Sequence, residues 1–209
     1  MRIILLRHGA TLSNQASRYL GRTDEPLSKL GIKQSEKAGS LTEIKRVYLS
    51  PLSRTKDTAA ICFPNAKTII VEDLTEMDFG DFEGRTAEEM KNDPSYNDWL
   101  NNNCESQCPH GESFLSLKKR VKKAFINIVE DVFLQGLDSA AIVAHGGSVM
   151  AIMASFADPW QPYFSWHVPN CQGYELLLHK EKWQNNPIID SYRRFEQLTW
   201  VKENCGFNL

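Results

Sequence analysis

Short apolar segments alternate with longer segments of helical periodicity along most of this 209-residue chain. Residues 2–7 (RIILLR) are the clearest short segment, and a continuous apolar run of this length is typical of a central strand covered on both faces. We expect strands over residues 2–7, 47–50, 67–71, 139–144, 173–178 and 188–195. Strands that alternate with helices predict a three-layer α/β/α sandwich with a mostly parallel sheet, in which one of the last two strands is antiparallel at an edge.

Capping residues and prolines set the limits of the expected helices. Ser28 is a suitable N-cap, and Pro51 suits the first turn of a helix, where no amide hydrogen is needed. The Asp93-Pro94 pair breaks the middle of the chain. We expect helices over residues 28–41, 51–60, 86–91, 96–100, 113–133 and 148–156. No repeat or Pro/Gly/Ser-rich linker divides the chain, so residues 1–209 are interpreted as a single domain.

Composition and charge exclude several classes of partner. Hydrophobic residues make up 42% of the chain and charged residues 24%, which is ordinary for a globular protein. The formal net charge is -2, so no global field draws the chain to nucleic acid or to an anionic membrane. No apolar stretch is long enough to span a bilayer, and the run over residues 3–6 is too short for a secretory signal. An anionic ligand must therefore be bound by cations gathered locally.

The cysteines do not form the pattern of a secreted disulfide framework. They are odd in number and scattered, at Cys62, Cys104, Cys108, Cys171 and Cys205. Secreted frameworks usually have an even count at denser spacing, so we expect reduced thiols and a cytoplasmic location. Cys104, Cys108 and His110 form a C-x3-C-x-H cluster that could suggest zinc. No fourth ligand follows at regular spacing, so we interpret these as loop residues and expect no metal.

Groups of polar residues directly follow several of the expected strands. They are Arg7-His8 after the first strand, residues 50–54 after the second, Glu76 after the third and His145 after the strand over 139–144. In open α/β sheets, ligands bind outside the carboxyl ends of the strands. We therefore expect these groups to converge on one site.

Each of these residues has an ordinary structural interpretation when it is taken alone. A single His8 at a strand end is more often incidental than reactive, and Arg7 or Arg54 could pair with a surface acid. Asn14 is typical of a turn or cap, and Gly146-Gly147 of a tight strand-to-helix turn. Arginine, however, can bind two phosphate oxygens at once. It is improbable that the ordinary interpretation is correct for every one of these residues, given the order in which they occur. The combination favours a phosphate site.

Four ordered motifs resemble those of the histidine phosphatase superfamily, the family with the phosphoglycerate mutase-like fold. They are LRHGAT over residues 6–11, SPLSRT over residues 50–55, Glu76 within LTEM, and AHGG over residues 144–147. The resemblance covers nearly the whole chain. It implies a phosphoglycerate mutase-like α/β fold and a phosphatase that needs neither a cofactor nor a metal, because two arginines and a histidine supply the positive charge.

The resemblance also implies a role for each matching residue. His8 would attack phosphorus in line and carry the phosphoryl group. Arg7 and Arg54 would clamp the equatorial oxygens, and His145 would donate a further hydrogen bond to them. Substrate-binding contacts are expected from Arg7, Asn14, Gly21, Thr23, Arg54, His145 and Gly146.

Glu76 matches the family's acid/base carboxylate, although Asp78, Asp81 and Glu83 lie close to it in the sequence. It would protonate the leaving oxygen and then take a proton from the water that hydrolyses the phosphohistidine. The first step needs a neutral His8 and a protonated Glu76, so a bell-shaped or acid-shifted rate profile is expected.

Hydrolysis is favoured over transfer between substrates. Mutases of the superfamily generally add an insertion between the acid/base glutamate and the second catalytic histidine, and often a C-terminal tail that keeps water out. Here the segment from Glu76 to His145 is compact and the tail after Phe195 is short.

Residues 76–84 (EMDFGDFEG) and 110–114 (HGESF) are similar to the branch that contains α-ribazole phosphatase, as are residues 19–24 and Trp166-His167. The resemblance implies hydrolysis of α-ribazole 5'-phosphate or cobalamin 5'-phosphate in cobalamin nucleotide-loop assembly. The benzimidazole would need a flat apolar surface, for which Phe79, Phe82 and Trp99 are candidates.

Two alternatives stay open. One is a broad-specificity phosphatase or phosphoglycerate mutase-like enzyme acting on small phosphorylated metabolites. The other is a non-catalytic binding domain of the same fold, which is disfavoured because the nucleophile, both arginines and the second histidine are present. In every case the expected partner is a small phosphorylated metabolite, and a homodimer is left open.

The remaining aromatic and basic residues have structural interpretations. Trp99, Trp160 and Trp166 are interpreted as core or pocket residues rather than a stacking platform for nucleic acid. For His167 a hydrogen-bonded structural role is preferred over one in the pocket. The expected solvated face of the helix over 113–133 carries Lys118, Lys119, Lys122 and Lys123.

Overall fold

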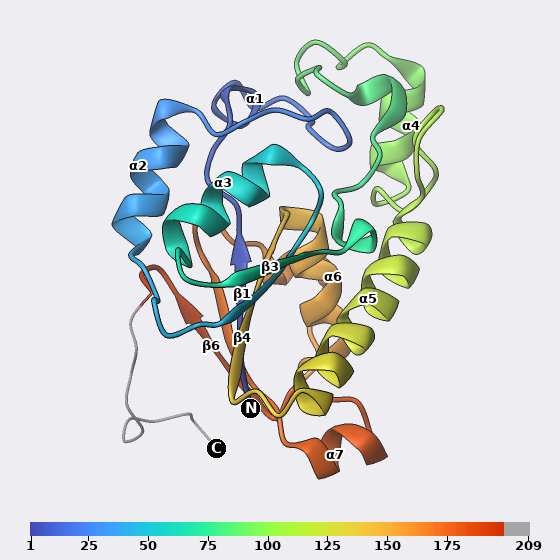
Figure 1. The fold of residues 1–209 in the computed structure, drawn as a ribbon. Coiled ribbons are helices and arrows are strands. Elements are labelled where there is room, and N and C mark those ends of the chain that lie inside the picture. Colours follow the sequence, from blue (N-terminus) through green and yellow to red (C-terminus); the bar gives the residue numbers. More distant parts are fainter. Residues whose placement is uncertain (199–209) are drawn as a thin grey trace.

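A computed structural model of the chain describes residues 1–198, and its centre is one six-stranded β-sheet. The strands are β1 (Arg2–Arg7), β2 (Arg46–Leu49), β3 (Lys67–Ile70), β4 (Ser139–Ala144), β5 (Gly173–Leu177) and β6 (Ser191–Phe195). Their order across the sheet is β3-β2-β4-β1-β5-β6 (Figure 1). All the strands expected from the sequence are present, with ends that shift by three residues or fewer.

The sheet is parallel except at one strand. β4 pairs in parallel with both β1 and β2, and β2 pairs in parallel with β3. β5 is antiparallel to both of its neighbours, β1 and β6. The expected antiparallel strand is therefore present as β5, but the prediction that it lies at an edge of the sheet is wrong. β6 follows β5 through the short helix α7 (Lys180–Asn185), pairs with the open side of β5 and becomes the edge itself.

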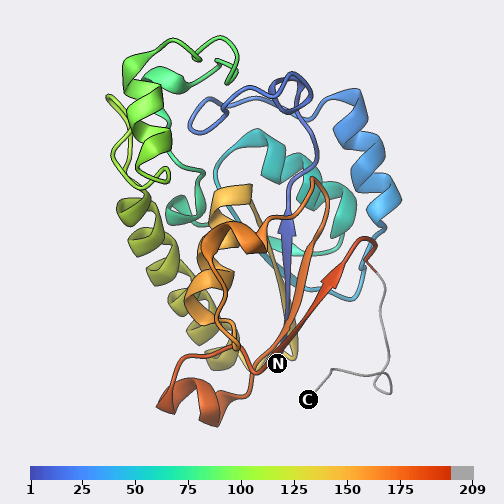
Figure 2. The ribbon, with the colours of Figure 1, turned by 180° about the vertical axis from the view of Figure 1, so that it is seen from behind.

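Helices cover both faces of the sheet, which confirms the three-layer arrangement (Figures 1 and 2). The covering helices are α2 (Lys29–Ala38), α3 (Ser53–Cys62), α5 (Phe114–Leu134) and α6 (Gly146–Phe156). Ile4 and Leu6 of β1 belong to the same buried cluster as Ala59 of α3. Ile3 and Leu5 belong to the opposite cluster, together with side chains of α5 and α6. Alternate residues of β1 thus point to opposite faces, and both faces are buried.

Shorter elements surround the carboxyl end of β1. They are α1 (Leu12–Gln15), α4 (Pro94–Asn101) and the single 3₁₀ turns η1 (Glu72–Leu74), η2 (Gly80–Phe82) and η3 (Tyr163–Trp166). In Figure 1, α1 and α4 lie beyond the tip of the β1 arrow. No helix within residues 1–198 has the length and apolar character needed to cross a membrane.

Capping explains where the covering helices begin. The Ser28 side chain accepts from the Gly31 amide over 3.1 Å, which confirms it as the N-cap of α2. Ser113 caps α5 in the same way through the Ser116 amide. The helix expected from Pro51 begins two residues later, at Ser53.

The helix expected over residues 86–91 is wrong, because the segment forms turns. Its start is held from outside: Arg18 forms an isolated β-bridge with Thr86, and its guanidinium binds the Glu89 carboxylate over 2.9 and 3.1 Å. Asp93 then caps α4, which leaves too few residues for a stable separate helix.

Candidate active site

The polar groups that follow the strands do meet at the carboxyl ends of β1, β2 and β4. The His8 amide donates to the carbonyl oxygen of Ala144, the last residue of β4, over 3.0 Å. The ring centroid of His145, the next residue, lies 5.0 Å from that of His8, with 64° between the ring planes. The side chains are only 3% and 0% exposed, so the two histidines form a buried pair.

His8 has one ring nitrogen engaged and one available. Its Nδ1 lies 2.6 Å from the carbonyl oxygen of Gly9, so Nδ1 carries the proton and Nε2 carries the lone pair. Burial lowers the pKa of His8 well below its usual value, and the charges of Arg54 and Arg7 lower it further. His8 is therefore a neutral imidazole, the form that can act as a nucleophile.

Arg7, the last residue of β1, has a buried donor of its guanidinium without a partner. Nη1 donates to the carbonyl oxygen of Val168 over 2.7 Å and lies 3.3 Å from Nε2 of His167. Nε is buried, and no described group accepts a hydrogen bond from it. Burial lowers the pKa of Arg7, while Glu76 raises it. A buried N–H of this kind is a donor for a phosphate oxygen.

Arg54, at the start of α3, is fully buried and held by backbone carbonyls. Nη1 donates to Thr23 O over 2.8 Å, Nη2 to Gly21 O over 2.7 Å, and Nε to Nδ1 of His145 over 3.3 Å. A Cβ on Gly21 would lie 1.8 Å from the carbonyl oxygen of Met77, so only glycine fits there. The structure places Gly21 and Thr23, expected to contact substrate, as backbone supports of Arg54.

His145 has a partner at each ring nitrogen. Nε2 lies 2.7 Å from Oγ of Ser50, and Nδ1 faces the Arg54 Nε–H. Burial and then the charges of Arg54, His8 and Arg7 lower its pKa well below the usual value. The neutral ring therefore carries its proton on Nε2, toward Ser50. With Nδ1 accepting from Arg54 and Nε2 directed at Ser50, both ring nitrogens are engaged within the protein.

Glu76 follows β3 and η1 in the sequence, and its carboxylate contacts the first turn of α6. Oε1 accepts from the Met77 amide over 2.9 Å, and Oε2 accepts from the Gly147 amide over 2.8 Å. A Cβ on Gly147 would lie 2.2 Å from Oε1, so this glycine makes room for the carboxylate. The Tyr163 hydroxyl donates to the carbonyl oxygen of the same glycine over 3.1 Å.

Arg120 of α5 carries no sequence signal for a role in the site, yet it holds the backbone of the Glu76 segment. Nε and Nη2 donate to the Glu112 carboxylate, each over 2.7 Å. Nη1 donates to Asp73 O over 2.9 Å and Thr75 O over 2.6 Å, and Nη2 also donates to Glu76 O over 3.0 Å. Every N–H of the guanidinium is used.

Asn14 serves both as a cap and as a lining residue. It forms a reciprocal capping box with Thr11 at the start of α1. Its Oδ1 also accepts from Nδ2 of Asn170 over 3.3 Å, and the same Nδ2 donates to the carbonyl oxygen of His8 over 3.0 Å. Asn170 is a second supporting residue without a sequence signal.

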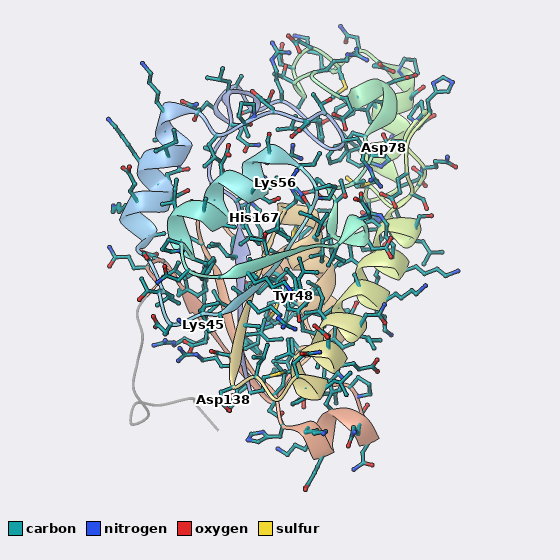
Figure 3. The ribbon with its side chains drawn as sticks, viewed as in Figure 1. Lys45, Tyr48, Lys56, Asp78, Asp138 and His167 are labelled. Atoms are coloured by element: carbon teal, nitrogen blue, oxygen red, sulfur yellow. The ribbon has the colours of Figure 1, made fainter. Side chains whose placement is uncertain are left out.

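A cavity of about 630 Å³ adjoins these groups. The residues that line it include Arg7, Asn14, Glu76, Gly146 and His167. His167, labelled in Figure 3, has the expected hydrogen-bond contact, with Arg7, and also lines the cavity. His8, Arg54 and His145 are more deeply buried and are not among its lining residues.

Aromatic side chains make up much of the cavity wall. Phe79 and Trp99 line it, as expected, whereas Phe82 is 1% exposed and belongs to the hydrophobic core. Phe79 lies just before the 3₁₀ turn η2 and Phe82 at its end, so the two side chains have different surroundings. Tyr19, Phe114, Tyr163 and Phe164 line the cavity without having been predicted.

The zinc alternative at Cys104, Cys108 and His110 is not supported by the geometry. Cys104 lines the cavity, Cys108 is fully buried, and His110 pairs with Asp81 over 3.0 Å. Among residues 1–198, no group of three or more His, Cys, Asp or Glu side chains is placed to hold a metal ion. Free thiols are present at Cys62, Cys104, Cys108 and Cys171, and Cys205 lies outside the described residues.

Comparisons with known proteins agree with this geometry. The chain matches the family model of the histidine phosphatase superfamily (branch 1) over residues 3–190. One relative, the probable phosphoglycerate mutase GpmB of Yersinia pestis (strain Pestoides F), is 26% identical over 216 aligned residues, which cover 99% of this chain and 93% of the relative.

Two crystal structures have a similar fold. The putative alpha-ribazole-5'-P phosphatase from Escherichia coli (str. K-12 substr. MG1655) superposes with a TM-score of 0.82 at 23% identity, covering 96% of this chain and 99% of its own. The alpha-ribazole phosphatase from Shigella flexneri gives a TM-score of 0.77 at 26% identity, and the superposition covers 87% of this chain and 92% of the Shigella chain. Because the family model spans most of the chain, this protein belongs to the histidine phosphatase superfamily, branch 1.

Proposed function

We propose that this protein hydrolyses phosphomonoesters through a phosphohistidine formed on Nε2 of His8. The observation that carries the proposal is the state of His8 itself. Its Nδ1 is committed to the Gly9 carbonyl oxygen over 2.6 Å, and burial beside two arginines keeps the ring neutral. A buried neutral imidazole with a free nitrogen is prepared for attack on an anion, since Arg7 and Arg54 supply the charge that attracts the phosphate.

The reaction divides into two displacements. In the first, Nε2 of His8 attacks phosphorus, the bond from phosphorus to the ester oxygen breaks, and Glu76 gives its proton to the leaving alkoxide. In the second, water attacks the phosphoryl group, Glu76 takes a proton from that water, and the bond from nitrogen to phosphorus breaks. The products are the alcohol and inorganic phosphate, and Glu76 returns to its starting state.

Arg7 and Arg54 stabilise the charge that gathers on the equatorial oxygens in both steps. Arg7 has its buried Nε available for this contact. Arg54 reaches the site in a fixed orientation, because the carbonyl oxygens of Gly21 and Thr23 hold its two terminal nitrogens. For His145 to donate to the phosphate, a second proton on Nδ1 must replace the hydrogen bond that this nitrogen accepts from Arg54 Nε.

For the physiological substrate we propose α-ribazole 5'-phosphate, or cobalamin 5'-phosphate. Support comes from the similarity to the alpha-ribazole phosphatase from Shigella flexneri and from a cavity wall that includes Phe79 and Trp99. Aromatic walls suit a flat apolar group such as a benzimidazole. The alternative is a broad-specificity phosphatase or a mutase, and the similarity to GpmB of Yersinia pestis favours the latter.

The mechanism is tested by hydrolysis of 4-nitrophenyl phosphate in the presence of EDTA. We expect activity to be unaffected by the chelator and to fall by at least about a thousandfold in His8→Ala, because the nucleophile is lost. Unchanged chemical denaturation of the variant serves as the control for folding. A requirement for metal, or full activity in His8→Ala, would contradict the proposal.

The substrate is tested by comparing kcat/KM for α-ribazole 5'-phosphate, 3-phosphoglycerate and a simple sugar phosphate. The proposal expects α-ribazole 5'-phosphate to be preferred. A higher kcat/KM for the sugar phosphate removes the cobalamin assignment and leaves the broad-specificity alternative. Appearance of the phosphoryl group on a second hydroxyl, instead of in inorganic phosphate, identifies a mutase.

A further inference from the structure

The cavity contains few charges away from its phosphate end. Its charged lining residues are Arg7, Arg18, Glu76 and Glu105, and no lysine lines it among the described residues. Arg7 and Glu76 belong to the phosphate end, where both have roles in the reaction. A second anionic group on a substrate therefore has Arg18 as its available cation.

Arg18 is already committed to other partners. Its two terminal nitrogens bind the two oxygens of Glu89 over 2.9 and 3.1 Å, and Nη1 also donates to the carbonyl oxygen of Gly84. The Arg18 backbone is bridged to Thr86, which fixes the base of the side chain. The Glu89 carboxylate already balances the charge of this guanidinium, so Arg18 offers little net attraction to a ligand carboxylate.

The rest of the wall disfavours a negative charge. Tyr19 contacts Phe79 and Trp99 with ring centroids 5.1 and 5.8 Å apart, and Phe114 contacts Tyr163 at 4.5 Å. The faces of aromatic rings carry negative partial charge, and a carboxylate taken from water into such surroundings loses hydration without compensation. Glu105, at the cavity's exposed side, adds a repulsive charge of the same sign.

We propose that this cavity selects phosphomonoesters whose alcohol carries an apolar or aromatic group and neither a carboxylate nor a second phosphomonoester. The inference rests on the proposed function in one respect, that the cavity receives the leaving alcohol. It goes further by excluding phosphorylated acids and bisphosphates as substrates of the same site, on grounds of charge.

Binding of non-hydrolysable phosphonates tests the inference separately from catalysis. Benzylphosphonate and 4-carboxybenzylphosphonate have the same ring and the same phosphonate, and differ by one carboxylate. We expect benzylphosphonate to bind at least about tenfold more tightly in isothermal titration calorimetry at neutral pH and constant ionic strength. Equal affinity, or tighter binding of the carboxylated compound, overturns the proposal.

A cation introduced into the wall should reverse part of this preference. Phe164 lines the cavity and is 59% exposed, so Phe164→Lys is compatible with folding. We expect it to improve the relative affinity for the carboxylated phosphonate by about threefold, the size of an exposed ion pair. Trp160→Lys is the matched control, because Trp160 is 69% exposed and does not line the cavity. An equal improvement in both variants means that general charge, and not the cavity, governs binding, and this overturns the proposal.

The outcomes separate the inference from the proposed function. If benzyl phosphate is not hydrolysed but the phosphonate preference holds, the catalytic proposal fails while the charge selection stands. If benzyl phosphate is hydrolysed and the phosphonates bind equally, the catalytic proposal stands and the charge selection fails.

Discussion

At the scale of single residues, the site depends on two histidines kept neutral beside two arginines. His8 and His145 are both fully enclosed, and the pKa of each is well below the usual value because of burial first and the charge of Arg54 second. Burial, and then repulsion from the two arginines, thus preserves the lone pair that the proposed attack by His8 requires. In the proposed mechanism, the same arginines that would bind phosphate also keep His8 in its nucleophilic form.

This arrangement has a consequence for stability. In the unfolded chain both histidines take up a proton below about pH 6.5, whereas in the folded protein they stay neutral to much lower pH. The unfolded state then binds more protons, so stability falls as the pH is lowered from about 7 toward 5. Each buried histidine contributes a slope approaching about 1.4 kcal/mol per pH unit in this window.

Urea denaturation at several pH values between about 5 and 7 measures this effect. We expect the pH dependence of the unfolding free energy to be weaker in His8→Asn and in His145→Asn than in the wild type, because each variant lacks one of the two groups. Identical pH dependence in all three proteins would mean that neither histidine is held neutral by the fold.

Prediction from sequence is strong for side chains with distinctive chemistry and weak for backbone contacts. The order and spacing of the motifs are enough to predict that His8, Arg54, Glu76 and His145 lie together. Gly21 shows the limit, because it contributes a carbonyl oxygen to Arg54, and such a contact has no side-chain signal. Gly21 is still required there for steric reasons, since a Cβ would collide with the carbonyl oxygen of the residue at position 77.

At the scale of elements, the segment that carries Glu76 is positioned by helices and not by the sheet. Arg120 of α5 binds the carbonyl oxygens on either side of Leu74 and that of Glu76 itself. Glu112, just before α5, accepts from Arg120, and its amide donates to the carbonyl oxygen of Asp78 over 2.8 Å (Asp78 is labelled in Figure 3). The beginning of α5 therefore sets the position of the acid.

Arg120→Lys tests this positioning role, because lysine keeps the charge but lacks the fork. We expect kcat/KM for benzyl phosphate, whose alkoxide needs a proton, to fall by about tenfold or more. The kcat/KM for 4-nitrophenyl phosphate, whose leaving group needs none, should change little. Glu76→Gln should show the same selectivity.

Lys123→Arg, on the exposed side of the same helix, is the control and should leave both substrates unchanged. Equal losses on the two substrates in Arg120→Lys would show that Arg120 supports the fold generally rather than the position of the acid.

Elements with clear caps and periodic apolar residues are predictable, and those fixed by distant contacts are not. Ser28 marks the start of α2 by a local hydrogen bond. The segment over residues 86–91 has helical spacing too, but Arg18, far away in the sequence, holds it in turns through Glu89. Likewise, β5 is an inner strand because β6 pairs with it, which depends on the rest of the sheet.

At the scale of the whole molecule, two hydrophobic clusters on opposite faces of one sheet hold the site at its carboxyl edge. The two-faced core and the position of the site at the edge of the sheet can be predicted from the alternation of apolar runs and helices. The cavity cannot be predicted in this way, because its wall is assembled from segments spread from residue 7 to residue 167. No local pattern distinguishes Phe79, which lines it, from Phe82, which is buried in the core.

Trapping the phosphoenzyme tests whether His8 carries the phosphoryl group. With 4-nitrophenyl phosphate, whose leaving group needs no proton, we expect the first displacement to be fast and the phosphoenzyme to accumulate before its hydrolysis. The sample is quenched in alkaline denaturant, which preserves phosphohistidine, and the modified peptide is sequenced by tandem mass spectrometry. We predict one phosphoryl group, on His8. Turnover with the phosphoryl group on another residue, or with none on His8, would contradict the account.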